Sequence, residues 1–230
     1  MEPDTFAVGS TIVSAFQAGR FFNGGASNIG FATSTNGGRS WTSGFLPATT
    51  VNATPAGPYP RASDPTVAYD AKHAVWLISY LGIVTPSGPV DVLVSRSTDG
   101  LTWGNPVVVN NDGDFNDKNW TACDNSTSSP FYGNCYTEFD DNTQGDLIQM
   151  STSSDGGLTW GAPLGTANNA HGIGGQPLPP TMVPCVVLGS QESDIGPASC
   201  VVGVQVAPPS DDVEYPTSSW QVELVQAALG

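Results

Sequence analysis

The sequence predicts an all-β fold made of repeated four-stranded units, and three observations support this prediction. The chain of 230 residues contains 27 glycines and 19 prolines, and only 12% of its residues are charged, so the helix formers Lys, Glu and Arg are scarce. Six Trp, six Tyr and nine Phe provide side chains for a buried core, which argues against disorder. A turn motif also recurs three times along the chain.

The repeated turn lies at residues 34–41, 97–103 and 153–160. Each copy has Asn or Asp followed by Gly, as a tight β-hairpin turn requires, and each ends on Trp. A pair of extended runs precedes each copy: 4–8 with 11–16, 64–69 with 74–80, and 119–123 with 134–139. We expect the polar side chains to bond N–H groups inside the turns and each indole to be buried against its own unit; the residues concerned are Asn36 with Trp41, Asp99 with Trp103, and Asp155 with Trp160.

These turns resemble Asp boxes, the Ser-x-Asp-x-Gly-x-Thr-Trp motif that repeats in bacterial neuraminidases, other sialidases and related β-propellers. The third copy matches in full, the first has Asn36 in place of Asp, and the second is one residue shorter. The resemblance covers about residues 2–176 and implies sialidase-type propeller blades at about 2–47, 62–106 and 117–163. A closed six-bladed ring would need roughly 330 residues at this repeat length. We therefore expect an incomplete ring, whose missing blades come from the rest of a longer chain or from another subunit.

Residues 177–230 differ from the first 176 residues, because they contain no fourth turn motif and are broken by eight prolines. They predict either an irregular tail or a degenerate fourth blade. Candidate strands lie at 185–188 and 200–206, and a terminal helix is expected at 220–229.

The charge and the cysteine content limit the classes of partner and the cellular locations that we expect for this protein. Six Lys and Arg against 21 Asp and Glu give a net charge of −15, which disfavours nucleic acid and anionic lipid as partners, and no apolar run is long enough for a membrane span. Cys123 and Cys135 flank a short polar loop and are predicted to form a disulfide, whereas the state of Cys185 and Cys200 stays open. These features favour an extracellular or cell-surface protein. Residues 1–4 do not resemble a signal peptide, so an export signal would lie outside this sequence.

The loops opposite the repeated turns are the expected binding face. The sialidase resemblance implies three arginines for the substrate carboxylate, an Asp acid/base, and a Tyr nucleophile with a Glu, but only Arg20 and Arg61 are suitably placed for the arginines. Two carboxyl groups could also act as general acid and base. The candidate catalytic residues are Arg61, Asp64 and Glu138, and the candidate ligand-binding residues are Arg20 and Tyr59. For Arg61 the alternative is a solvated loop arginine, and for Asp64 it is a turn cap before Pro65.

The acidic run 110–117 offers oxygen ligands at alternating positions, as calcium prefers, although it is not an EF-hand. Asp112, Asp114, Asn116 and Asp117 are the candidate ligands, shared with Asp140 or Asp141, and a solvated acidic loop is the alternative. No other cofactor is implied. The sequence therefore favours part of a secreted exo-α-sialidase-type glycoside hydrolase that acts on glycans and is catalytically incomplete alone. The alternative is a non-catalytic propeller module that binds carbohydrate or protein.

Overall fold

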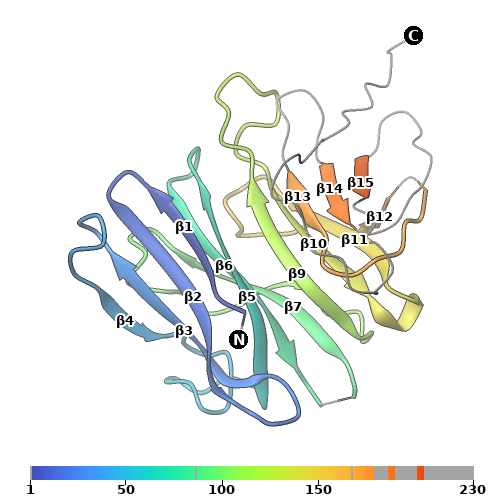
Figure 1. Cartoon of the computed structure of the whole chain (residues 1–230), viewed down its shortest axis with the longest axis horizontal. Coiled ribbons are helices and arrows are strands. Elements are labelled where there is room, and N and C mark those ends of the chain that lie inside the picture. Colours follow the sequence, from blue (N-terminus) through green and yellow to red (C-terminus); the bar gives the residue numbers. More distant parts are fainter. Residues whose placement is uncertain (1, 86, 167, 179–185, 190–200, 205–230) are drawn as a thin grey trace, which may run out of the picture.

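The computed structural model describes residues 2–85, 87–166, 168–178, 186–189 and 201–204, and the predicted all-β fold is confirmed for them. The only helical segment among them is a single 3₁₀ turn at Asn142–Gln144. Twelve strands form three antiparallel blades that lie in a row in Figure 1, and a single pair, Ala26 with Ala62, joins the first two blades into one eight-stranded sheet. Blade one contains β1 (Asp4–Val8), β2 (Thr11–Arg20), β3 (Ala26–Ser34) and β4 (Thr42–Phe45); blade two contains β5 (Arg61–Asp70), β6 (Val75–Ile83), β7 (Val90–Ser97) and β8 (Val107–Asn110); blade three contains β9 (Asn116–Cys123), β10 (Cys135–Asp141), β11 (Leu147–Ser153) and β12 (Leu164–Gly165).

The blades pack face to face through two apolar clusters. Alternate side chains of a strand point to opposite faces of the sheet, and β6 follows this rule. Its Trp76, Ile78 and Tyr80 pack against blade one, and its Val75 and Leu77 pack against blade three. The first strands of the blades, β1, β5 and β9, contact one another in sequence order, so we call them the inner strands.

The three repeated turns connect the third and fourth strands of their blades and share one hydrogen-bond pattern. In the second turn, Asp99 Oδ1 accepts the N–H groups of Leu101 and Thr102 at 2.8 and 2.7 Å, and the Ser97 hydroxyl binds the same oxygen at 2.9 Å. Asp155 Oδ1 likewise accepts the N–H groups of Leu158 and Thr159, and Asn36 Oδ1 accepts the N–H group of Ser40.

The prediction that each turn tryptophan is buried against its own blade is wrong for Trp41, and Trp103 and Trp160 pack in clusters that two neighbouring blades share. Trp103 of blade two packs on Phe31 of blade one, with ring centroids 5.8 Å apart, and Trp160 of blade three packs on the cluster centred on blade two. Trp103 is only 7% exposed, whereas Trp41 of blade one is 49% exposed. Trp103 and Trp160 therefore fill the space between blades. Trp41 stays half-exposed because no described blade precedes blade one.

Cys123 and Cys135 form the predicted disulfide, between directly paired residues of β9 and β10. A small third sheet follows blade three: β13 (Gln176–Leu178) pairs antiparallel with β14 (Val186–Gly189), which pairs in parallel with β15 (Val201–Val204). The predicted terminal helix, Cys185 and Cys200 lie outside the described residues. Among the described residues there is no helix with the length and apolar character needed to cross a membrane.

Candidate functional site

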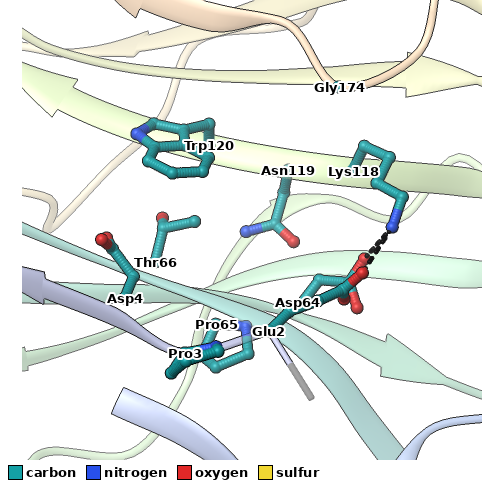
Figure 2. A pocket seen from close by; sticks show the side chains of 10 residues that line it. All are labelled: Glu2, Pro3, Asp4, Asp64, Pro65, Thr66, Lys118, Asn119, Trp120 and Gly174. Atoms are coloured by element: carbon teal, nitrogen blue, oxygen red, sulfur yellow. Dashed lines mark hydrogen bonds and ion pairs between the residues drawn. The ribbon is translucent and has the colours of Figure 1, made fainter. Parts of the chain in front are cut away.

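A pocket of about 180 Å³ lies where the inner strands of the three blades meet (Figure 2). Its charged groups come from three different blades, while Trp120 presents an indole ring to one side. The lining residues are Glu2, Pro3, Asp4, Asp64, Pro65, Thr66, Lys118, Asn119, Trp120 and Gly174.

Three charged residues of this pocket occupy the same position in the three repeats. In each blade the turn serine pairs with a residue of the second strand, and that residue pairs with one of the inner strand. The three sets of paired residues are Ser34–Ile12–Ala7, Ser97–Trp76–Tyr69 and Ser153–Cys135–Cys123. Glu2, Asp64 and Lys118 each lie five residues before these inner-strand positions. The repeat therefore brings Glu2, Asp64 and Lys118 together because equivalent positions of neighbouring blades lie side by side.

Local backbone distortions direct two of these side chains into the pocket. The pairing register shifts in β5 between Ser63 and Thr66, and it shifts in β9 opposite Glu138 and Asp140. An extra residue in a strand forms a β-bulge, which re-aims side chains. Asp64 and Lys118, in these two bulges, have φ values of 47° and 51°, a conformation uncommon for residues other than glycine.

Lys118 joins the two carboxyl groups. Its Nζ lies 2.8 Å from Glu2 Oε1 and 3.4 Å from Asp64 Oδ2. The second oxygen of Asp64 accepts the Ser63 hydroxyl at 2.6 Å and the Gln17 amide at 3.3 Å. Figure 2 shows Lys118 reaching down to both carboxyl groups.

The pKa values of Glu2 and Asp64 are shifted in opposite directions. Burial, followed by a hydrogen bond with Glu2, raises the pKa of Asp64 to about 7, although Ser63 and Lys118 oppose this shift. The hydrogen bond with Asp64, together with Lys118, lowers the pKa of Glu2 to about 2. Burial lowers the pKa of Lys118, but Glu2 and Asp64 raise it further, so the lysine stays charged. Near neutral pH the pocket thus holds an ionised Glu2, a cationic Lys118 and an Asp64 that can release or accept a proton.

Two further polar groups border this charge cluster. Asn119 is 2% exposed; its amide nitrogen donates to Ser79 at 2.8 Å, and its oxygen has no hydrogen-bond partner among the described residues. Asp140 accepts the backbone N–H of Gly174 at 3.4 Å. Burial raises the pKa of Asp140 to about 7, with Asp117 adding to the shift and Lys118 opposing it.

The other predicted catalytic residues do not line this pocket. Glu138 is fully buried in β10 and is not among the lining residues, so the structure does not pair it with Asp64 across the site. Arg61 donates to Asn23 Oδ1 at 2.8 Å and to the Gly24 carbonyl at 2.7 Å, and its guanidinium lies 4.3 Å from the Phe21 ring centroid. It belongs to a second, separate pocket.

Arg20 and Tyr59 also lie away from the inner strands' pocket. Arg20 is exposed at the end of β2. The Tyr59 hydroxyl donates to Asp91 Oδ2 at 2.6 Å, and burial together with this bond raises the pKa of Tyr59. The arginines expected for a sialidase are therefore not gathered with Asp64 by the described blades.

The predicted calcium ligands are only partly brought together. Asp112 and Asp114 converge with Asp141, and one oxygen of each lies within 4.8 Å of the others, so these three could hold a cation. Asn116 is linked to Asp112 by a 3.3 Å hydrogen bond from its amide nitrogen. Asp117 is not part of this group, since it pairs opposite Asp140 in the β9–β10 ladder.

Sequence reasoning missed Glu2, Lys118, Asn119 and Trp120 as parts of the site. The turns between first and second strands differ in length, so the copies cannot be aligned on the inner strands by counting back from the turn serine. A comparison of positions relative to the first hairpin of each blade would have indicated Glu2, Asp64 and Lys118 as equivalents.

Neither family models nor curated proteins match this chain. Solved structures do: the microbial sialidase Hz136 of Hadza origin is 17% identical with a TM-score of 0.51, and a Trypanosoma rangeli sialidase is 14% identical with a TM-score of 0.52. An exo-β-1,3-galactanase from Phanerochaete chrysosporium, solved with β-1,3-galactotriose, is 14% identical with a TM-score of 0.51. Each alignment covers 76% of this chain but only 39%, 32% and 40% of the respective structure. The chain thus has the β-propeller fold found among sialidases and other glycoside hydrolases, and it spans two fifths or less of these relatives' length.

Proposed function

We propose that this chain forms the glycan-facing part of a glycosidase-type propeller related to the exo-α-sialidases, in which Asp64 exchanges a proton with the bound glycan. The observation that carries the proposal is a buried carboxyl group with a pKa of about 7 in a pocket shared by three blades. A carboxyl group with a pKa near neutrality can protonate a leaving oxygen and later take a proton back. The lining indole of Trp120 suits the apolar face of a sugar ring.

We expect the 230-residue chain alone to bind glycans without turning them over. Glycoside hydrolysis requires a second carboxyl group about 5–9.5 Å from the first, on the other side of the scissile bond. Glu2 does not supply this second group, because Lys118 Nζ lies 2.8 Å from Glu2 Oε1 and 3.4 Å from Asp64 Oδ2, so the two carboxyl groups share one cation instead of flanking a bound sugar. The missing carboxyl group and the arginines of a sialidase would come from further blades.

Binding and turnover measured on the same protein test this proposal. Isothermal titration with sialyllactose and with β-1,3-galactotriose should detect weak binding of at least one glycan, and Trp120→Ala should abolish it. Arg61→Ala is the matched control and should leave binding unchanged, because Arg61 lies in the other pocket. Fluorogenic α-sialosides and β-galactosides should give no turnover. Absence of glycan binding, binding that survives Trp120→Ala, or turnover of either fluorogenic substrate by the 230-residue chain would contradict the proposal.

The second candidate is a non-catalytic module that binds carbohydrate or protein. It is favoured by Arg61, whose guanidinium is held by Asn23 and Gly24 rather than presented to the inner strands' pocket. For such a module, Asp64→Asn leaves glycan affinity unchanged from pH 5 to pH 8, whereas a proton-exchanging Asp64 makes the affinity depend on pH. The disulfide and the acidic composition support an extracellular setting for both candidates.

A further inference from the structure

The carboxyl groups that line the inner strands' pocket outnumber its cations. Glu2, Asp4 and Asp64 contribute three carboxyl groups, and Lys118 is the only Lys or Arg among the lining residues. Lys118 is already engaged, because its Nζ lies 2.8 Å from Glu2 Oε1 and 3.4 Å from Asp64 Oδ2. A ligand carboxylate in this pocket would therefore meet an ionised Glu2 and a lysine that is already paired, and like charges at such short range repel.

The arginines of the described blades do not change this balance. A carboxylate is best bound by a guanidinium, whose planar fork offers two parallel donors. Arg61 lies in the second pocket, where its Nη1 donates to Asn23 and to the Gly24 carbonyl. Arg20 is exposed at the end of β2. The whole chain also carries a net charge of −15, and a field of this sign lowers the local concentration of anions.

Asn119 supplies a hydrogen-bond acceptor that the described residues leave unused. Its amide nitrogen is held by donation to the Ser79 hydroxyl at 2.8 Å, and its oxygen, in a side chain that is 2% exposed, has no partner among the described residues. Figure 2 shows this oxygen on the side of the amide toward Asp64 and Lys118. Buried polar atoms are nearly always hydrogen-bonded, so such an oxygen indicates a bound water or ligand. A sugar hydroxyl can donate to it, whereas an ionised carboxylate can only accept.

The size and the apolar wall of the pocket limit the ligand further. The volume of about 180 Å³ is well below the roughly 300–1,000 Å³ of sites for drug-sized ligands, so the pocket holds one sugar ring at most. The indole of Trp120 offers an apolar surface to the C–H face of such a ring. The hydroxyls at the edge of the ring then remain free for the polar groups of the pocket.

We propose that the sugar ring bound in this pocket is neutral, that one of its hydroxyls donates to Asn119 Oδ1, and that the pocket rejects sugars with a carboxylate, sialic acid included. The inference rests on the proposed glycan binding and narrows it to one class of sugar. An acidic ring of a longer glycan would lie outside this pocket.

Matched pairs of sugars test the rejection of carboxylates on the full chain. The methyl β-glycosides of galactose, glucose and mannose are each compared with the corresponding uronate, in which a carboxylate replaces the CH₂OH group. NMR titrations at pH 7, followed on the Trp120 indole N–H and assigned with Trp120→Phe, give a dissociation constant for each sugar. The neutral sugar that binds most tightly should bind about ten-fold or more tightly than its uronate, because like charges disfavour the wrong partner.

Two variants separate the Asn119 oxygen from the bond that supports the side chain. Asn119→Ala removes both the oxygen and the hydrogen bond to Ser79, whereas Ser79→Ala removes only that bond. Asn119→Ala should weaken binding of the neutral sugar several-fold and leave the uronate's affinity nearly unchanged, so the ratio of the two affinities falls. Ser79→Ala should keep the wild-type ratio. Thermal melts followed by circular dichroism show whether both variants are folded, and if Asn119→Ala is not, the wild-type ratios alone decide.

The outcomes distinguish this inference from the proposed function. A uronate that binds as tightly as its neutral partner overturns the inference and leaves glycan binding in place. A folded Asn119→Ala protein with the wild-type affinities, or equal losses in Asn119→Ala and Ser79→Ala, does the same. If none of the six sugars shifts the Trp120 signal, glycan binding in this pocket fails, and the inference fails with it.

Discussion

Replacing Asp64 by Asn should change how the stability of the protein depends on pH. The pKa of Asp64 is about 7 in the folded protein against a usual value of 3.8, because burial and Glu2 favour the protonated form. A group whose pKa is raised on folding stabilises the protein below its unfolded pKa, and this contribution is lost as pH rises through the folded pKa. The wild type should therefore lose stability from Asp64 between pH 4 and pH 8.

The size of the effect follows from the same values. At about 1.4 kcal/mol for each unit of pKa difference, the Asp64 contribution is at most about 4 kcal/mol across this interval. Asn resembles the protonated acid and can still donate to Glu2. The free energy of unfolding of Asp64→Asn should thus be close to that of the wild type at pH 4 and exceed it by up to about 4 kcal/mol at pH 8.

Urea denaturation at pH 4, 5, 6, 7 and 8 measures this difference. Asp99→Asn is the contrasting control, because hydrogen bonds from Thr102 and Leu101 lower the pKa of Asp99 to about 2. Its contribution is present above the unfolded pKa and is lost as pH falls, so its difference from the wild type should stay constant from pH 5 to 8. Parallel curves for the wild type and Asp64→Asn over the whole range, or a relative loss of stability at high pH in Asp64→Asn, would refute the reasoning.

Three further predictions concern packing, the disulfide and the acidic cluster. Trp103→Ala should lower the free energy of unfolding by about 3–5 kcal/mol and the half-exposed Trp41→Ala by roughly half as much or less, and equal losses in urea denaturation would contradict the packing described. Replacing Cys123 and Cys135 together by Ala should cost about 2–3 kcal/mol by the same assay, and no loss would show that the bond does not constrain the chain. Calorimetric titration with calcium should give heat that disappears in Asp112→Asn but persists in Asp117→Asn, and identical heats for both variants would exclude the Asp112, Asp114 and Asp141 site.

Much of the fold could be predicted because turn chemistry and alternation are local properties. The expected pair 64–69 with 74–80 corresponds to β5 and β6, and the pair 119–123 with 134–139 corresponds to β9 and β10. The partner of Trp103 could not be predicted, since Phe31 lies in another blade and nothing near the turn specifies it. Contacts between blades depend on how whole sheets stack, which a motif of eight residues does not encode.

The candidate site was predictable only in part for a related reason. Asp64 was expected from its place at the head of an inner strand, but a β-bulge with positive φ at Asp64 and Lys118 aims both side chains into the pocket. Neither residue is glycine, so the sequence carries no sign of this conformation. Arg61 was predicted to contact an anionic ligand from its charge and its loop position, yet its Nη1 donates to Asn23 and to the Gly24 carbonyl.

The way in which the repeats differ explains why the site is harder to find than the fold. Residues that build a blade recur, so Ser34, Ser97 and Ser153 reveal themselves when the copies are compared. At the inner-strand position the copies diverge to Glu2, Asp64 and Lys118, and this divergence produces the chemistry: three identical acids would repel one another, whereas a lysine between two acids allows one to stay ionised and the other to hold a proton near neutral pH. In a propeller, equivalent positions of the inner strands face one another, so substitutions that break the repeat there act together on one pocket. The site is therefore located by comparing the charges of equivalent inner-strand residues between blades. This comparison requires the strand register, because the register decides which residues are equivalent.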